Sequence, residues 1–284
     1  MSTPPPPAHH SAPDDLRAAV REALASPATT ATHASRSGLT SDLTIDETLI
    51  LHSVEWVPRD LVIGLSVQSV PSAIWSWGSG EIELASRAHA RAFEHAIARL
   101  HAEAVAVGAH GVVGVHVERR ILASHIEVEL IGTAVAPADA SAAGGTKVFI
   151  SDLPARDFAL LLMAGWRPVA LAVGASFTYA PRRAVGAALR QQTQNVELTN
   201  YTAALYTARS TAMERMQRAA LDAHGTGIVD VTITEGPLHF AAHAIGFTAW
   251  GTVVAPAASS RTIDPLTVVS LDDAVSSFDV APLA

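Results

Sequence analysis

Apolar and polar residues follow one another in the same order twice along the chain. Each time, a short helical segment precedes an apolar run typical of a strand, a long stretch of helical periodicity, and two β-rich runs separated by a short turn. The expected strands span 61–67 and 169–177, and the expected long helices span 82–107 and 202–223. The pattern therefore predicts an α+β fold of two tandem copies of a small domain, each with a short helix, a strand, a long amphipathic helix and a C-terminal β-hairpin.

Start and stop signals support the two short helices. Thr44 and Glu47 have the spacing of a capping box, in which the threonine side chain accepts a hydrogen bond from the third helical residue. In the second copy, Asp152 and Pro154 mark the start and Gly165 the end. Each short helix is therefore expected directly before the strand of its copy.

Recurring residues at regular spacings indicate an internal duplication. Ser-Asp-Leu at 41–43 returns at 151–153, which is 110 residues later. The spacing grows to 116 between Gly111 and Gly227, and to 119 near the ends of the copies, so the second copy carries small insertions. The predicted organisation is a disordered Pro/Ala-rich arm at 1–37, a first domain at 38–137, a linker at 138–147, a second domain at 148–256 and a tail at 257–284.

The first hairpin alternates between an apolar and a polar face. The apolar face is expected to hold Val113, Val115, Val117, Ile126, Val128 and Leu130. The polar face is expected to hold His116, Glu118, His125, Glu127 and Glu129. A turn at 121–124 would place His116 opposite Glu129, Glu118 opposite Glu127, and Arg120 opposite His125.

These five polar residues are the candidate metal ligands. Imidazole and carboxylate groups together suit zinc, nickel or manganese, and facing carboxylates repel each other unless a cation or a proton lies between them. The alternative is a solvated sheet face whose polar side chains only keep it wet. The aligned positions of the second copy hold Thr232, Thr234, Ala244, Gly246 and Thr248, so a metal site would belong to the first copy alone.

Composition narrows the classes of function. The chain is 49% hydrophobic and 16% charged with a net charge of −8, which excludes a disordered protein and disfavours nucleic acid or an anionic membrane as partner. Sparse charge also favours surface buried in an oligomer. The absence of cysteine excludes disulfides, thiolate metal sites and thiol nucleophiles. With no export signal and no membrane-length apolar helix recognisable, we expect a cytoplasmic protein.

The sequence offers little for catalysis. Ser66 and Ser176 follow Gly-x but lack the second glycine of a nucleophile elbow. Gly80 runs straight into a helix, where Glu81 and Glu83 are expected to satisfy the helix dipole instead of a bound anion. We therefore expect no enzymatic activity and no catalytic residues.

Glycine-containing runs recur at the hairpins, Gly108 to Val115 and Gly132 to Val135 in the first copy, and Gly227 to Val229 and Gly251 to Val254 in the second. With the motifs that precede them, these runs resemble the YbjQ-like family of bacterial proteins, whose usual label is heavy-metal-binding domain. The chain departs from the family at His110, where Asp or Asn is usual, and at Asp230, which stands where the first copy has Gly114.

The resemblance implies compact α+β domains assembled as rings, typically pentamers. We therefore predict a non-catalytic, ring-forming homo-oligomer that binds a divalent metal or a small ligand. Five is odd, so five two-domain chains are expected to form two stacked rings tied by the linker. The alternative is a structural or adaptor protein that recruits a protein partner through its N-terminal arm or C-terminal tail.

Overall fold

The computed structural model describes residues 40–70, 80–122, 125–139, 147–180, 198–237 and 243–257 of the 284-residue chain. The predicted arm, all of the predicted tail except Ala257, and most of the predicted linker lie outside these residues. Both copies of the duplication belong to one compact unit, Leu39–Ala284. Along the described chain, no helix combines the length and the apolar character that a membrane span requires.

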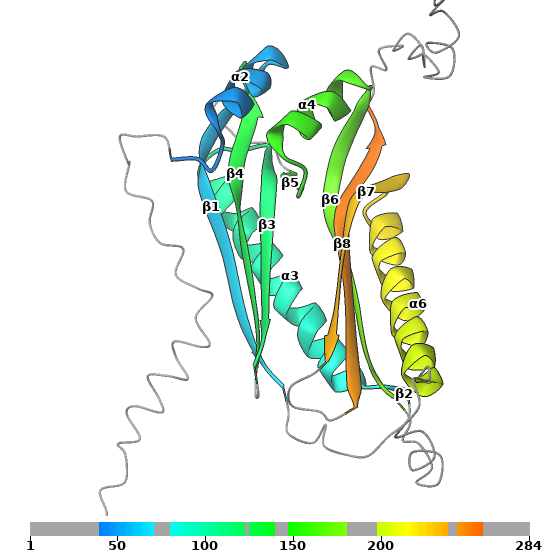
Figure 1. Cartoon of the computed structure of the whole chain (residues 1–284). Coiled ribbons are helices and arrows are strands. Elements are labelled where there is room, and N and C mark those ends of the chain that lie inside the picture. The colour runs from blue at the N-terminus through cyan, green and yellow to red at the C-terminus, as the bar shows by residue number, and fades with distance from the viewer. Residues whose placement is uncertain are drawn as a thin grey trace, which may run out of the picture. The chain divides into compact units, whose positions relative to one another are not determined.

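The two halves contain the same pattern of elements, which confirms the predicted α+β class (Figure 1). Copy 1 comprises α2 (Ile45–Ser53), β1 (Trp56–Ser69), β2 (Gly80–Glu81), α3 (Glu83–Ala106), β3 (Gly111–Ile121) and β4 (His125–Pro137). Copy 2 comprises β5 (Phe149–Ile150), α4 (Ala155–Met163), β6 (Trp166–Tyr179), α6 (Thr199–Asp222), β7 (Gly227–Pro237) and β8 (Ala244–Pro256). Whether each copy folds by itself, as the predicted domain boundaries imply, stays a prediction.

The predicted capping box opens α2. The Thr44 hydroxyl accepts a hydrogen bond from the backbone N–H of Glu47 at 3.3 Å, and the Glu47 carboxylate accepts one from the Thr44 N–H at 2.9 Å. Strands β1 and β6 run beyond the predicted limits, since both begin at the tryptophan before their proline. A register shift between Pro58 and Asp60 accommodates this proline, which has no N–H to donate to a regular ladder.

Each copy completes its sheet with a strand of the other copy. The first sheet has the order β1-β4-β3-β5 and the second has the order β2-β6-β8-β7. Phe149 of β5 lies parallel to Gly111 of β3, and Gly80 of β2 lies antiparallel to Tyr179 of β6. The copies are therefore joined by more than the linker 138–147, because they exchange strands and share a core, and the predicted stacking of two rings stays a prediction.

Helix α3 lies between the two sheets, and α6 covers the other face of the second sheet (Figure 1). The alanines of α3 pack on copy 1, whereas its second face, with His89 and Phe93, packs on copy 2. The two central strands of the second sheet, β6 and β8, are therefore buried on both faces, whereas its edge strand β7 is largely exposed. The first sheet is covered on its other face only near α2 and α4, where Val113 and Val135 are buried, and along β1 from Val62 to Val67 the alternating burial shows one open face.

A β-bulge at Gly114 breaks the alternation predicted for the first hairpin. Gly114 has a φ of 63°, and the register of β3 with β4 shifts between Val113 and His116. Val113 consequently packs beside α2 and α4, while Val115 joins the main core. The prediction that Val113 and Val115 share a face is wrong, because the bulge adds one residue to the two-residue period of the strand. Asp230 keeps the same backbone in copy 2, with a φ of 54°.

Candidate functional site

The predicted metal ligands lie on the uncovered face of the first sheet, in β3 and β4. Glu118 lies opposite Glu129 and Arg120 opposite Glu127, so the predicted cross-strand pairs are wrong by two residues. The hairpin turns later than predicted because Ile121 remains in the strand, where it pairs with the buried Ile126. The polar side chains still share one face, with His116 beside this pair of carboxylates along the strand and His125 at the start of β4.

Arg120 neutralises the acidic part of this face. Its guanidinium lies 2.8 Å from the Glu118 carboxylate and 3.8 Å from that of Glu127. His125 Nε2 lies 3.2 Å from Glu127 Oε1. No three His, Asp or Glu side chains converge as a metal-binding group in the described part of the chain. The charged side chains of this face are therefore paired with one another rather than arranged around a metal position, and metal binding stays a prediction.

The same face carries a row of exposed aliphatic side chains on β1. Ile63, Leu65 and Val67, here called the outer row, are 41%, 49% and 53% exposed. Their counterparts in copy 2, at positions 173–177, lie beneath α3 in the shared core. A contiguous apolar row left open on one copy and buried on the other is typical of an interaction surface.

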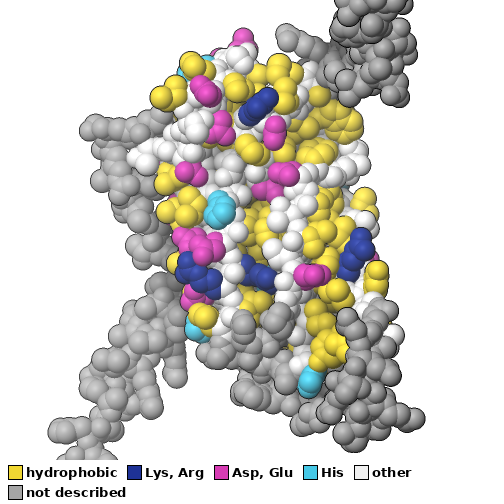
Figure 2. All heavy atoms as spheres, in the orientation of Figure 1, with side chains coloured by type: hydrophobic (Ala, Val, Ile, Leu, Met, Phe, Trp, Pro, Cys, Tyr) yellow, Lys and Arg dark blue, Asp and Glu magenta, His cyan; other side chains and the backbone are white. Residues whose placement is uncertain are grey.

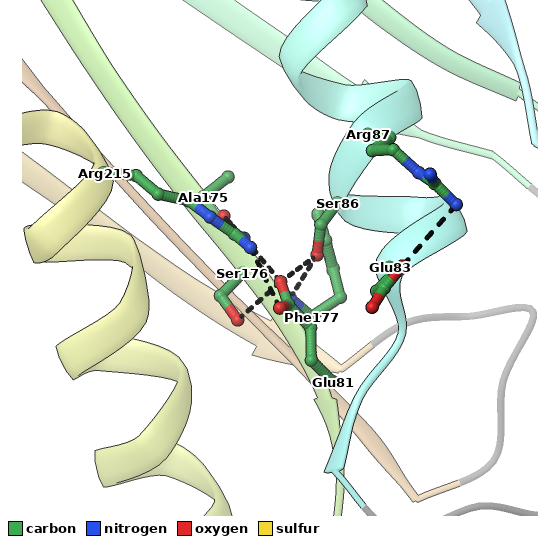
Figure 3. Close-up of polar contacts among 8 residues, drawn as sticks. All are labelled: Glu81, Glu83, Ser86, Arg87, Ala175, Ser176, Phe177 and Arg215. Carbon is green, nitrogen blue, oxygen red and sulfur yellow. Dashed lines mark hydrogen bonds and ion pairs between the residues drawn. The ribbon is translucent and has the colours of Figure 1, made fainter. Parts of the chain in front are cut away.

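Glu81 fastens the two copies together (Figure 3). It precedes α3 and forms an ion pair with Arg215 of α6, whose Nη2 donates to Glu81 Oε2 at 2.9 Å. Ser86 and Ser176 donate hydrogen bonds to Glu81 Oε1 at 2.7 and 3.2 Å. Arg215 also donates to the carbonyl oxygen of Ala175 at 2.7 Å. A single carboxylate of copy 1 thus joins a strand and a helix of copy 2.

The charge on Glu81 is maintained by these partners. Burial alone raises the pKa of Glu81, but the hydrogen bonds and the charge of Arg215, together with the two serine hydroxyls, outweigh burial and hold the pKa below its usual value. Glu81 is therefore ionised at neutral pH. The prediction that Glu81 serves the helix dipole is wrong, since it lies in β2 and its carboxylate faces copy 2.

Copy 1 repeats this arrangement, but without a carboxylate among the described residues. Arg99, the counterpart of Arg215, donates to the carbonyl oxygen of Leu65. Ser66, the counterpart of Ser176, is 1% exposed, and its hydroxyl has no hydrogen-bond partner within the described ranges. The residue that corresponds to Glu81 by the 116-residue spacing is Glu197, which lies outside the described residues.

A buried histidine lies beside a cavity of about 490 Å³ between the copies. His89 is fully buried against Phe93 and Phe177, and burial first, then the charge of Arg119, lower its pKa to about 3. It is therefore neutral, and its Nε2 lies 3.4 Å from the Thr248 hydroxyl, which is longer than an ordinary hydrogen bond between a hydroxyl and a ring nitrogen. The geometry indicates a core residue rather than a general base.

Sequence reasoning missed the Glu81–Arg215 pair, because its partners are 134 residues apart. The one available signal was the recurrence of glutamate before both long helices, at 81 and 197, combined with arginine at 99 and 215. Both recurrences keep the 116-residue spacing. Their pairing across the copies depends on the strand exchange, which no spacing in the sequence reveals.

Comparison of the chain with known proteins identifies its family. A family model for YbjQ, described as "Putative heavy-metal-binding", matches residues 43–138, which correspond to copy 1. A Mycobacterium tuberculosis protein named "Encapsulin nanocompartment protein Rv1762c" is 34% identical over 247 residues, covering 84% of this chain and 94% of that protein. The chain belongs to the YbjQ family. This confirms the resemblance drawn from the signature residues. The comparison with solved structures found no match.

The extent of the second match bears on the duplication. The 247 aligned residues exceed the length of one YbjQ copy, so the mycobacterial relative resembles both copies of this chain.

Proposed function

We propose that this YbjQ protein is a non-catalytic structural protein that associates head to tail with further copies of itself and forms part of a protein nanocompartment in the cytoplasm. The carrying observation is the outer row, which is open on copy 1 although the same surface of copy 2 is buried by α3. The name of the mycobacterial relative supports the nanocompartment. The buried neutral His89 and the mutually paired Glu81 and Arg215 offer no catalytic arrangement in the described chain.

Head-to-tail contacts either close into a ring or extend as a filament. The family resemblance implies rings of five copies. A ring that repeats the internal junction instead holds an even number of copies, because each chain supplies two, so the proposed ring differs from the five-copy ring of the resemblance.

The outer row yields the first test. We expect Leu65→Asp to weaken self-association at least tenfold, because a charged side chain would replace an apolar one worth about 1.5–3 kcal/mol on burial. Light scattering and native mass spectrometry across micromolar concentrations measure the effect. The matched control is Leu84→Asp, at a leucine that is 39% exposed on α3. A parent protein that is monomeric at these concentrations would overturn the proposal.

A divalent cation on the polar face of the first sheet is a second candidate function. The register that sets Glu118 directly opposite Glu129 favours it, since two facing carboxylates repel each other unless a positive group lies between them. Arg120 already supplies part of that charge. A cation would therefore have to compete with it.

If this face binds a cation, the double variant Glu118→Gln/Glu129→Gln should abolish binding of Zn²⁺ or Mn²⁺ by the full chain. Isothermal titration and elemental analysis after gel filtration provide the measurement. The matched control, Glu83→Gln/Glu214→Gln, removes two exposed carboxylates from the helices. Equal binding by the parent and the Glu118/Glu129 variant would exclude these ligands.

A further inference from the structure

Copy 2 has an open groove between α6 and β7. Its volume is about 380 Å³. Its mainly apolar lining includes Met213, Met216, Ala220, Leu221, Ile228 and Val231. Figure 2 shows hydrophobic side chains open at the surface between isolated charged groups on the face drawn there. Two of the groove residues, Leu221 and Val231, are 70% and 38% exposed, so the groove lacks a cover in the described chain.

The corresponding groove of copy 1, between α3 and β3, is filled. Strand β5 lies in it, where Val148 and Ile150 are nearly fully buried. The Phe149 ring lies on the opposite face of the sheet, against Trp56 and Phe158, and packs on Gly111 so closely that a Cβ at that glycine would stand 2.1 Å from the ring. The Phe149 N–H donates to the carbonyl oxygen of His110 at 3.2 Å, which attaches the segment to the edge of the sheet.

The matching glycine of copy 2 has no such neighbour. Gly227 corresponds to Gly111, and the nearest atom to a Cβ there would be Val254 Cγ2 at 3.6 Å. Strand β7 is the outermost strand of its sheet in the described chain. The space above Gly227 and the edge of β7 therefore reproduce the β5 site, but without its occupant.

We infer that the occupant is residues 39 and 40 of a second copy of this chain, lying parallel on β7 as β5 lies on β3. Leu39 corresponds to Phe149 by the 110-residue spacing and lies outside the described residues, and Thr40 is exposed. By this correspondence Leu39 would lie over Gly227 as Phe149 lies over Gly111, and Thr40 would face the groove as Ile150 faces α3. A free strand edge pairs with an added strand through backbone hydrogen bonds. This inference rests on the proposed self-association and names the surface through which it occurs.

The placement of the following residues indicates why the occupant comes from another molecule. In copy 2, the Asp152 N–H is bound by Thr252 of its own sheet, while Phe149, three residues earlier, lies on the other copy. In copy 1, the Asp42 N–H is bound in the same way by Thr133 of its own sheet. By the repeat spacing, the segment before Asp42 then corresponds to the one that lies on the other copy at the internal junction, and residues 1–37 repeat none of the copy motifs.

Copy 1, which forms the other side of the proposed contact, also has polar groups that lack, among the described residues, the partner seen at the internal junction. Ser66 and Arg99 lie where Ser176 and Arg215 receive Glu81 at the internal junction. The second copy would bring Glu197 to this place, as the sequence counterpart of Glu81. The two halves of the contact are therefore complementary but different, which makes it head to tail rather than twofold symmetric.

Charge distinguishes this contact from the internal junction. Arg119 donates to Thr248 and Thr234 inside the chain. By the repeat spacings its counterpart is Glu235, and the two threonines correspond to Glu129 and Glu118. The contact between chains therefore brings like charges close together, and added salt should strengthen it by screening their repulsion.

Two variants test the contact from its two sides. Gly227→Val places a side chain in the space above β7, where a Cβ meets no atom of the described chain nearer than 3.6 Å, and Leu39→Asp places a charge on the incoming segment. We expect each to weaken self-association of the full chain at least tenfold at 0.3 M salt. Gly236→Val, on the same strand with nothing within 4 Å of its Cβ position, is the matched control. Circular dichroism checks that the variants remain folded.

Mixing the two variants gives the decisive measurement. The Leu39→Asp chain keeps an intact groove and the Gly227→Val chain keeps an intact Leu39, so an equimolar mixture should form a one-to-one dimer of twice 29.6 kDa. Native mass spectrometry with one chain isotope-labelled detects it. An oligomeric parent whose assembly neither variant weakens would overturn this inference alone. A monomeric parent would overturn the proposed function with it. If circular dichroism shows that one of the two variants has lost helix content, the other variant alone tests the contact.

Discussion

Gly174→Ala is expected to lower the free energy of unfolding by about 3 kcal/mol, because the new methyl group has no space. A Cβ at Gly174 would lie 2.0 Å from the carbonyl oxygen of Ala212 and 2.6 Å from the backbone nitrogen of Met216. Both atoms belong to the backbone of α6, so no side-chain rotation relieves the clash. Thermal unfolding should show the loss as a fall in Tm of roughly 6–12 °C.

Gly236→Ala is the matched control for this prediction. It lies in the same sheet, and nothing stands within 4 Å of its Cβ position. We expect its Tm to stay within about 2 °C of the parent or to rise slightly, since alanine restricts the unfolded chain more than glycine does. A Gly174→Ala protein as stable as Gly236→Ala would show that α6 does not press on β6 as described.

Asp152→Asn is expected to stabilise the protein by about 2 kcal/mol above pH 7. Burial raises the pKa of Asp152 from its ordinary 3.8 to about 6, and the charge of Asp230 adds to this against a hydrogen bond from Thr252 at 2.5 Å. The folded protein therefore binds a proton that the unfolded chain has lost. Its contribution to stability is fully present below pH 4 and is lost as the pH rises through 6.

The amide removes this titration while still accepting the Thr252 hydrogen bond. The difference between Asp152→Asn and the parent should shrink from about 2 kcal/mol at pH 8 to near zero at pH 4. Urea unfolding at several pH values measures it. The lowered pKa of His89 acts in the opposite direction below pH 6.5, but it is common to both proteins and cancels in the difference. A pH-independent difference would show that Asp152 does not titrate in this range.

Local signals in the sequence were sufficient for the helices and for the duplication. The capping box at Thr44 and Glu47 depends on residues three apart, and the long helices depend on a period of about 3.6 residues. The duplication was found from residues that recur at spacings of 110 and 116, and finding such spacings requires no knowledge of contacts. The bulge at Gly114 was accessible in principle, because a glycine inside a strand pattern often marks one.

Contacts between distant segments were decided only by the tertiary structure. The register of the first hairpin is one example. Ile121 pairs with the buried Ile126, and with this register every observed cross-strand pair differs from the predicted one by two residues.

By itself, the sequence determined an α+β chain built twice, because periodicity and recurrence are properties of neighbouring positions. It did not determine that β2 and β5 cross to the other copy, that Glu81 meets Arg215, or that the outer row is left open while its counterpart is buried. Those features depend on which surfaces meet when the two copies pack. Two copies of one pattern can pack in several ways with the same local structure, and the burial of α3 between the sheets selects among them.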